Sequence, residues 1–303
     1  MSSTDLAPLA LAAALATAGC APSGPPVPGV PSLTLPLQEL SGLAVSGGSL
    51  FGVGDASAKL AVMDLASRTA RAVSLPLPHH AAGSQLEGVA IDAAGRVWAL
   101  EEEPGAVYVL ALDGDAATLL HTFHIVVPSG DPLHAAWKAD ANARGEGLAL
   151  MAHGHVLVAK QRHPVRLIEL GPAGDDPLGL PAPPLPGDAL ALPGEAASDL
   201  VPLAEWAPAD DAATARIADI SDLSADPSGV WILAGRSHLV ARLALPLDPA
   251  SATFAATDLR PLPTPIDGLV FEGLAFDGLG HALLGVDRKG RDPNVAVLPW
   301  VAP

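Results

Sequence analysis

The sequence predicts an all-β fold built from repeated antiparallel sheets, and three observations support this prediction. A short phrase, EGLA or a close variant, occurs five times along the chain. In four copies a glycine lies eight positions after the first residue, and a second apolar run follows it. Three copies carry an Asp-x-x-Gly step here, which is typical of a hairpin because Asp caps the turn and Gly takes a positive φ. We call the first residue of each phrase its anchor; the anchors are Ser41, Glu87, Glu146, Ser221 and Glu272.

The strand runs predict a β-propeller. They are often apolar at consecutive positions, which suits sheets covered on both faces, and radial stacking provides this cover. Successive anchors lie 46, 59, 75 and 51 residues apart, and a four-stranded blade takes roughly 40–50 residues. We therefore expect five blades and an insertion at about 171–199, which is dense in Pro and Gly. A sixth, degenerate blade in that stretch is the alternative; a β-sandwich or two small β domains would not predict one phrase five times.

The last unit lacks a fourth strand, because only about 30 residues follow its anchor. The segment SLTLPL at residues 32–37 precedes the first anchor and has strand character. We expect it to complete the last blade, which would close the ring through the amino terminus and remove exposed strand edges. The expected propeller domain spans residues 33–303.

The amino-terminal segment predicts an export signal. Residues 6–18 form an apolar run that ends in small residues just before Cys20. This run is too short to span a bilayer comfortably but fits a signal peptide. Its tail resembles a bacterial lipoprotein signal, in which cleavage leaves the cysteine at the new terminus for lipidation, although Thr17 stands where that family favours Leu. The expected organisation is a signal peptide at 1–19, a lipidated Cys20 and a Pro-rich tether over 20–32, with ordinary secretion and cytoplasmic residence as alternatives.

The composition limits the classes of molecule that the protein is expected to bind. The 303 residues include 33 acidic and 16 basic side chains, giving a net charge of −17. This acidity argues against nucleic acid, whose phosphates need Lys and Arg, and against electrostatic docking on anionic lipid. Membrane contact is therefore expected through the lipid anchor only, in the periplasm or at the cell surface. The single cysteine excludes an intrachain disulfide framework and a Cys-rich metal site.

The five phrases resemble those of the SdiA-regulated and phytase-like (esterase-like activity of phytase) extracytoplasmic β-propellers. The resemblance covers roughly residues 35–300 without the insertion. For the phytase-like family it implies phosphate-ester hydrolysis, and for the SdiA-regulated family it implies binding, with Ca²⁺ as a candidate ion. The matching residues are Glu39-Leu-Ser-Gly-Leu with Asp55, Leu86-Glu-Gly-Val-Ala with Glu101–Glu103, Asn142-Ala-Arg-Gly-Glu-Gly-Leu-Ala with Lys160, Asp219-Ile-Ser-Asp-Leu, and Phe271-Glu-Gly-Leu-Ala.

Strand direction places a candidate site at one mouth of the central channel. If each anchor begins an innermost strand, that strand runs away from the face where the chain enters. The hairpin then returns the second strand to the same face, so that anchors and second-strand ends surround one mouth. These ends lie 14 or 15 residues after the anchors, at Asp55, Glu101, Glu102, Lys160, Gln161, Gly235, Arg236, Val286 and Asp287.

Each unit also supplies one carboxylate near the axis. Three anchors are Glu, and the two Ser anchors have an acid two residues earlier, on the same side of a strand. The resulting metal-site candidates are Glu39, Glu87, Glu146, Asp219 and Glu272. Converging carboxylates raise one another's pKa values unless a cation such as Ca²⁺ or neighbouring Arg and Lys side chains neutralise them. The alternative is that these acids only accept backbone hydrogen bonds from the neighbouring blade.

The expected function is the binding of a small ligand or divalent cation at this mouth by a lipid-anchored cell-envelope protein. The ligand-binding candidates are Asp55, Glu102, Lys160, Arg162, Arg236 and Arg288. A phytase-like or esterase-like metal-assisted hydrolase is one alternative, with Glu101, Glu146 and Asp287 as acid–base candidates. The sequence contains no G-x-S-x-G, H-E-x-x-H, P-loop or Rossmann motif. A scaffold that binds another envelope protein is the second alternative.

Overall fold

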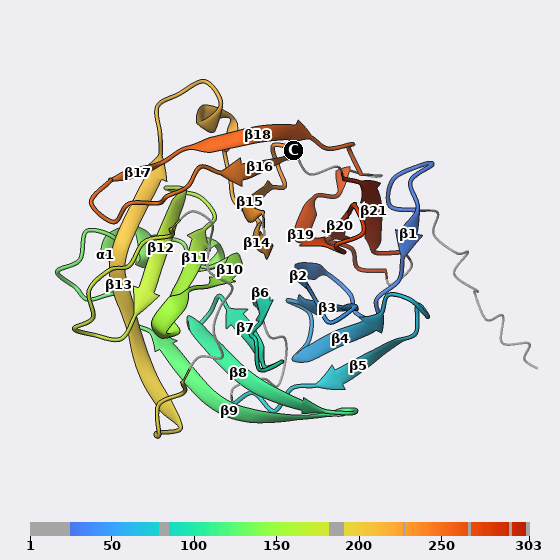
Figure 1. Cartoon of the computed structure of the whole chain (residues 1–303), viewed down its shortest axis with the longest axis horizontal. Coiled ribbons are helices and arrows are strands. Elements are labelled where there is room, and N and C mark those ends of the chain that lie inside the picture. The colour runs from blue at the N-terminus through green and yellow to red at the C-terminus, as the bar shows by residue number, and fades with distance from the viewer. Residues whose placement is uncertain are drawn as a thin grey trace, which may run out of the picture.

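The protein has an all-β fold of the β-propeller type, as the repeats predict. A computed structural model describes residues 25–78, 85–181, 191–226, 228–265, 268–290 and 293–300. Figure 1 shows mostly antiparallel sheets arranged around a central axis, with β2, β6, β10, β14 and β19 nearest the axis. In the described part of the chain, no helix is long and apolar enough to cross a membrane.

Two sheets are simple four-stranded meanders. We name each sheet by its innermost strand. The β2 sheet contains β2 (Leu40–Ser46), β3 (Ser49–Gly54), β4 (Lys59–Asp64) and β5 (Ala70–Ser74). The β14 sheet contains β14 (Asp222–Asp226), β15 (Gly229–Ala234), β16 (Leu239–Leu243) and β18 (Ala256–Pro261).

The β6 and β10 sheets are joined at their outer edges. The β6 sheet contains β6 (Leu86–Ile91), β7 (Val97–Glu101), β8 (Ala106–Asp113) and β9 (Ala116–Ile125). The β10 sheet contains β10 (Gly147–Leu150), β11 (Val156–Lys160), β12 (Arg166–Gly171) and β13 (Ala197–Pro208). The long strand β13 pairs antiparallel with β12 and parallel with β9, and its end pairs with β17 (Thr253–Phe254). Short helical segments lie between strands: α1 (His134–Ala139), η1 (Ala141–Ala143), η2 (Ala152–Gly154) and η3 (Thr214–Arg216).

The β19 sheet combines both ends of the described chain. It contains β19 (Phe271–Phe276), β20 (His281–Val286), β21 (Val295–Pro299) and β1 (Ser32–Leu33), which pairs antiparallel with β21. Residues 34–37 are not a strand, so the predicted strand over 32–37 is shorter than expected. The buried side-chain amide of Asn294 holds them instead, through Leu35 N–H (2.9 Å), Leu35 O (3.1 Å) and Leu37 O (2.9 Å).

The Pro-rich segment before β1 is part of the domain. Pro26 and Val27 are buried, and Val27 packs with Trp231 and Trp300 in the core between the β14 and β19 sheets. A free tether over the whole of 20–32 is therefore wrong for the residues from Pro26 onwards.

The insertion at 171–199 is partly built into the core. Its described residues, 171–181 and 191–199, add no further sheet, and β13 begins at Ala197. The Glu169 carboxylate accepts the N–H groups of Leu178 (2.8 Å) and Gly179 (2.9 Å). The next residue, Leu180, is buried and forms a bridge with Leu247.

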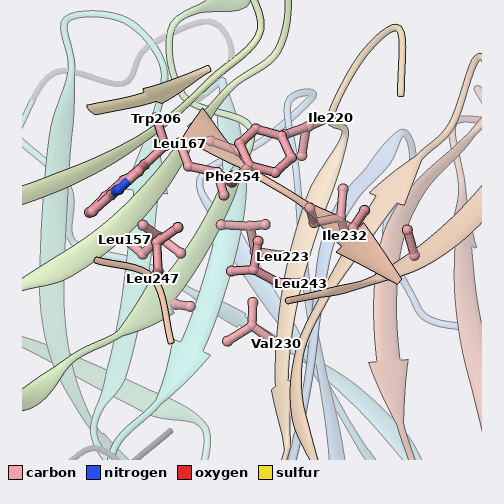
Figure 2. Close-up of a cluster of buried hydrophobic side chains, with 14 of the residues drawn as sticks. Leu157, Leu167, Trp206, Ile220, Leu223, Val230, Ile232, Leu243, Leu247 and Phe254 are labelled. Carbon is pink, nitrogen blue, oxygen red and sulfur yellow. The ribbon is translucent and has the colours of Figure 1, made fainter. Parts of the chain in front are cut away.

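The hydrophobic core fills the gaps between neighbouring sheets. One apolar cluster lies between each adjacent pair: β2 and β6, β6 and β10, β10 and β14, β14 and β19, and β19 and β2. Figure 2 shows the cluster between the β10 and β14 sheets, where Leu157, Leu167 and Trp206 face Leu223 and Ile232. This cover on both faces accounts for the consecutive apolar positions in the strands.

Glycines after the anchors let the inner strands approach closely. A Cβ on Gly147 would lie 2.4 Å from Leu223 N and 2.7 Å from Asp222 C, both main-chain atoms of the next inner strand. Gly42, Gly88 and Gly273 face neighbouring inner strands in the same way. The glycine of the phrase therefore serves packing around the axis.

We expect Gly147→Ala to lower the free energy of unfolding by about 3 kcal/mol, since the main chain of β14 must move to admit a methyl group. Urea unfolding measures this loss. Gly130→Ala is the control, because no atom lies within 4 Å of its added Cβ. Equal stability of the two variants would contradict the packing role.

Candidate functional site

Three anchors, Ser41, Glu87 and Glu272, are the extra residues of β-bulges at the start of their inner strands. Leu40 pairs with Gly54 and Gly42 with Val53, so that Ser41 has no partner in the register. The same shift occurs around Glu87 and Glu272. In the other two sheets the anchor N–H donates to the carbonyl opposite the next residue: Glu146 to Ala159 (3.0 Å) and Ser221 to Leu233 (2.8 Å). A bulge redirects a side chain, and all five anchors lie at the starts of their inner strands.

The strand register places the second-strand ends beside the anchors, as the topology predicts. Leu86, just before Glu87, pairs with Glu101, and Glu102 follows. Phe271, just before Glu272, pairs with Val286, and Asp287 follows. We call six side chains at this end the mouth carboxylates: Asp55, Glu87, Glu102, Glu146, Glu272 and Asp287.

The mouth carboxylates are close enough to affect one another's ionisation. Burial raises the pKa of Glu87 well above its usual range, and the charges of Glu102, Glu272 and Asp55 raise it further. Burial likewise raises the pKa of Glu146, with added repulsion from Glu87, Glu102 and Glu272. These mutual effects show that acids from the β2, β6, β10 and β19 sheets meet at one mouth.

The remaining mouth carboxylates are also easier to protonate than in water. Burial, followed by the charges of Asp287 and Asp55, raises the pKa of Glu272 to about 8. Burial raises the pKa of Glu102 to about 7, although the Arg144 N–H bonded to its carboxylate (3.0 Å) acts in the opposite direction. For Asp55, burial and the charges of Glu39 and Asp287 raise the pKa to about 6. The pKa of Asp287 is raised by burial and by Glu39.

The mouth carboxylates have no basic counterparts in direct contact. Among the described residues, no Lys, Arg or His nitrogen lies within 4.0 Å of their oxygens. The charges of Arg162 and Arg236 act on Glu146 and Glu272 only from a greater distance.

Three basic side chains around the mouth donate to main-chain carbonyls, and Arg162 Nε also lies 3.9 Å from Asp140 Oδ2. Lys160 is fully buried and donates to Ala143 O (2.9 Å) and Arg162 O (2.8 Å), and burial lowers its pKa. Arg162 and Arg288 donate to Asn142 O and Pro293 O, each at 3.2 Å. Lys160 therefore contacts no mouth carboxylate directly, and the charge of Glu102 acts on it through space.

The structure turns Glu101 away from the mouth. Its side chain is fully buried and accepts a hydrogen bond from the hydroxyl of Tyr108, inside the core between the β2 and β6 sheets. Successive side chains of a strand point to opposite sides, so the next residue, Glu102, lies at the mouth. We therefore leave Glu101 out of the candidate site.

Glu39 and Asp219 differ from the Glu anchors. The Asp219 carboxylate accepts the Arg236 N–H (3.0 Å) and the Ser221 and Ser237 hydroxyls (both 3.2 Å), and so holds the turn after β15. The carboxyl group of Glu39 hydrogen-bonds Asp55. For Asp219 the structural alternative, a carboxylate used for hydrogen bonding within the fold, is the better description.

A fully buried carboxylate beside the axis was missed by the sequence analysis. Asp222 replaces the glycine that follows the other anchors, and its side chain is fully buried. It accepts the N–H groups of Leu274 (2.8 Å), Leu223 (2.8 Å) and Leu43 (3.4 Å), and thereby links three inner strands. Burial raises its pKa, and these N–H groups partly oppose the rise. The signal was present in the sequence, since SDLS breaks the pattern of the phrase.

The donor chemistry suits a hard cation, but the arrangement does not. Carboxylate oxygens are the ligands that Ca²⁺ prefers. In the described ranges, no three His, Cys, Asp or Glu side chains are grouped so that they could hold one metal ion. Ca²⁺ binding by these carboxylates stays a prediction.

Comparisons with known proteins concern the fold. No family model matches the chain, and no curated protein matches it. Among solved structures, the chain is similar to a PQQ-bound aldose sugar dehydrogenase from Streptomyces coelicolor (15% identity, 92% of this chain, 99% of that chain, TM-score 0.48). It is also similar to streptogramin B lyase (12% identity, 90% of this chain, 74% of that chain, TM-score 0.40). A third similar structure is hydrazine synthase of Kuenenia stuttgartiensis (11% identity, 91% of this chain, 99% of that chain, TM-score 0.41). None of these likenesses indicates a ligand or an activity for this chain.

Proposed function

We propose that this protein binds a small ligand or a cation at the mouth carboxylates. The supporting observation is that five partly or wholly buried acids and the exposed Asp55 gather at one mouth, with no ion pair to any described Lys, Arg or His. Buried negative charge is unfavourable unless protons or a positive partner compensate it. A ligand that brings positive charge or hydrogen-bond donors provides this compensation.

Ligand-induced stabilisation of the wild type and of Glu146→Gln tests this proposal. A ligand that binds only the folded protein raises its stability by RT ln(1 + [L]/Kd). We expect a saturable rise in melting temperature with a positively charged or donor-rich compound, and its loss in Glu146→Gln. Glu195→Gln, at an exposed residue, is the matched control. If Glu146 only staples the fold, the substitution will lower stability by about 1–3 kcal/mol without any ligand.

The hydrolase alternative has less support. Glu146 and Asp287 remain acid–base candidates at the mouth, while Glu101 is buried against Tyr108. The family assignment to SdiA-regulated or phytase-like propellers is likewise a proposal that rests on the five phrases. A panel of phosphate and acyl esters, run with and without Ca²⁺, checks for turnover.

We further propose that the protein is exported and lipidated at Cys20, which lies outside the described residues. The apolar run and small-residue tail before Cys20 support this. Replacing Cys20 by Ser is expected to move the protein from the detergent phase to the aqueous phase. Unchanged partitioning would contradict lipidation.

The ring is proposed to have five blades and to close through its amino-terminal segment. The cycle of five apolar clusters and the pairing of β1 with β21 support this. We expect Asn294→Ala to lower the free energy of unfolding by about 2–4 kcal/mol, because three buried main-chain groups lose their partner. Asn142→Ala, at an exposed site, is the control in the same urea titration. A loss no larger than in the control would show that the segment does not hold the ring together.

A further inference from the structure

We propose that the ligand at the mouth is an organic ammonium compound with several N–H donors, such as a diamine or polyamine, rather than a single metal ion. This inference rests on the proposed binding function and specifies its ligand class. Three observations carry it: an unused buried amide oxygen, an unused buried carboxylate, and the distribution of the acceptors over separate strands.

The unused amide belongs to Gln161. This side chain is 5% exposed, and its Oε1 is buried without a hydrogen-bond partner in the described part of the chain. Gln161 follows β11 as Glu102 follows β7 and Asp287 follows β20. The preceding Lys160 directs its ammonium group to Ala143 O, and side chains alternate along an extended chain. We therefore place the Gln161 amide on the same side as the mouth carboxylates.

The unused carboxylate belongs to Glu146, which is 6% exposed. No described donor hydrogen-bonds to it, and the charges that act on it are those of Glu87, Glu102, Glu272 and Arg162. Buried polar groups in folded proteins nearly always have a partner. Gln161 thus presents a buried amide oxygen that lacks a donor, and Glu146 presents a carboxylate with no described hydrogen-bond donor.

The acceptors come from separate strands, which favours a ligand with separated donors. They lie at the starts of β6, β10 and β19 and after the ends of β3, β7, β11 and β20. Ca²⁺ needs six to eight oxygens at about 2.3–2.6 Å from one point, and no such grouping exists among the described acids. Ammonium groups joined by methylene segments donate at several points, and each donates to a carboxylate or amide oxygen on its own.

Isothermal titration at pH 8 and 150 mM salt tests the ligand class with the full chain. The probes are putrescine and spermidine, and three controls isolate their chemistry. Butane-1,4-diol has the length of putrescine without its charge, tetramethylammonium has the charge without N–H donors, and CaCl₂ supplies a metal. We expect saturable binding of the amines only, and the salt screens non-specific attraction to the acidic surface.

Substitutions at both unused acceptors locate the binding. Glu146→Gln is expected to weaken amine binding about tenfold, since a hydrogen bond to a charged group is lost, and Gln161→Leu about threefold. Glu195→Gln is expected to bind like the wild type. Neither Glu146→Gln nor Gln161→Leu removes a hydrogen bond within the described protein, so neither variant should melt at a lower temperature than the wild type without ligand.

The outcomes separate this inference from the proposed function. Binding of Ca²⁺, sensitive to Glu146→Gln, without amine binding would overturn the ammonium ligand and keep the binding function. Amine binding that is equal in the wild type and in Glu146→Gln would place the amines elsewhere on the acidic surface and overturn the inference. The absence of Glu146-dependent binding of every probe, together with no Glu146-dependent stabilisation by any positively charged or donor-rich compound, would overturn both.

Discussion

The ligand-free protein is expected to melt at a lower temperature at pH 9 than at pH 6, by about 10 °C. The pKa of Glu272 is raised to about 8 and that of Glu102 to about 7, while burial and repulsion also raise those of Glu87 and Glu146. Between its ordinary pKa and its raised pKa, each group holds its proton in the folded state but has lost it in the unfolded state. Stability is therefore present at low pH and is lost as the pH rises through the folded-state value.

Glu272→Gln is expected to flatten this dependence between pH 7 and 9, because the amide never ionises. Glu195→Gln, which is exposed, should keep the wild-type slope. Thermal melts followed by circular dichroism measure the pH dependence of both variants, in buffers without primary amines or divalent cations. A melting temperature that is constant or rises from pH 6 to pH 9 would show that the mouth carboxylates are not held in a shared, partly protonated state.

Asp222→Ala is expected to lower the free energy of unfolding by about 3–5 kcal/mol, since three main-chain N–H groups near the axis lose their acceptor. Those groups belong to Leu43, Leu223 and Leu274, on three inner strands, so the loss affects the centre of the ring. Asp222→Asn keeps the shape and one acceptor oxygen, and we expect about half of that loss.

Chemical denaturation followed by tryptophan fluorescence measures these changes. Asp115→Ala is the control, because Asp115 forms only an exposed ion pair with Arg71 (3.1 Å), and such pairs contribute little. An effect of Asp222→Ala as small as that of the control would contradict this role. It would mean that water reaches the three N–H groups near the axis and replaces the carboxylate.

The repeated phrase predicted the fold because each copy contains features that act within one repeat: an apolar strand, a turn and a glycine where inner strands approach closely. The turns also located the mouth, because a hairpin after each anchor returns the second strand to the end of the sheet where the anchor lies. The parallel pairing of β13 with β9 left no such signal, because it joins segments about 75 residues apart and depends on packing.

The direction in which side chains point at the mouth was harder to predict than which residues lie near it. Glu101 and Glu102 are neighbours of the same type, and the strand register decides which of them faces the core. Lys160 was expected to neutralise acids, but buried carbonyls nearby compete for the same ammonium group. Asp222 was visible only as a departure from the phrase, and its role depends on N–H groups contributed by two distant repeats.

The packing of the amino-terminal segment fixes how a lipid-anchored copy would stand on its membrane. β1 runs antiparallel to β21, and Pro31 accepts the Val297 N–H, so residues before Pro31 lie beside Trp300 and the β19–β20 hairpin, at the end of the ring opposite the anchors. Between Cys20 and Pro26 the chain reaches at most about 20 Å. A lipid on Cys20 would thus hold the ring close to the bilayer by the end opposite the anchors, and the acidic mouth would open towards the aqueous compartment, where soluble ligands diffuse.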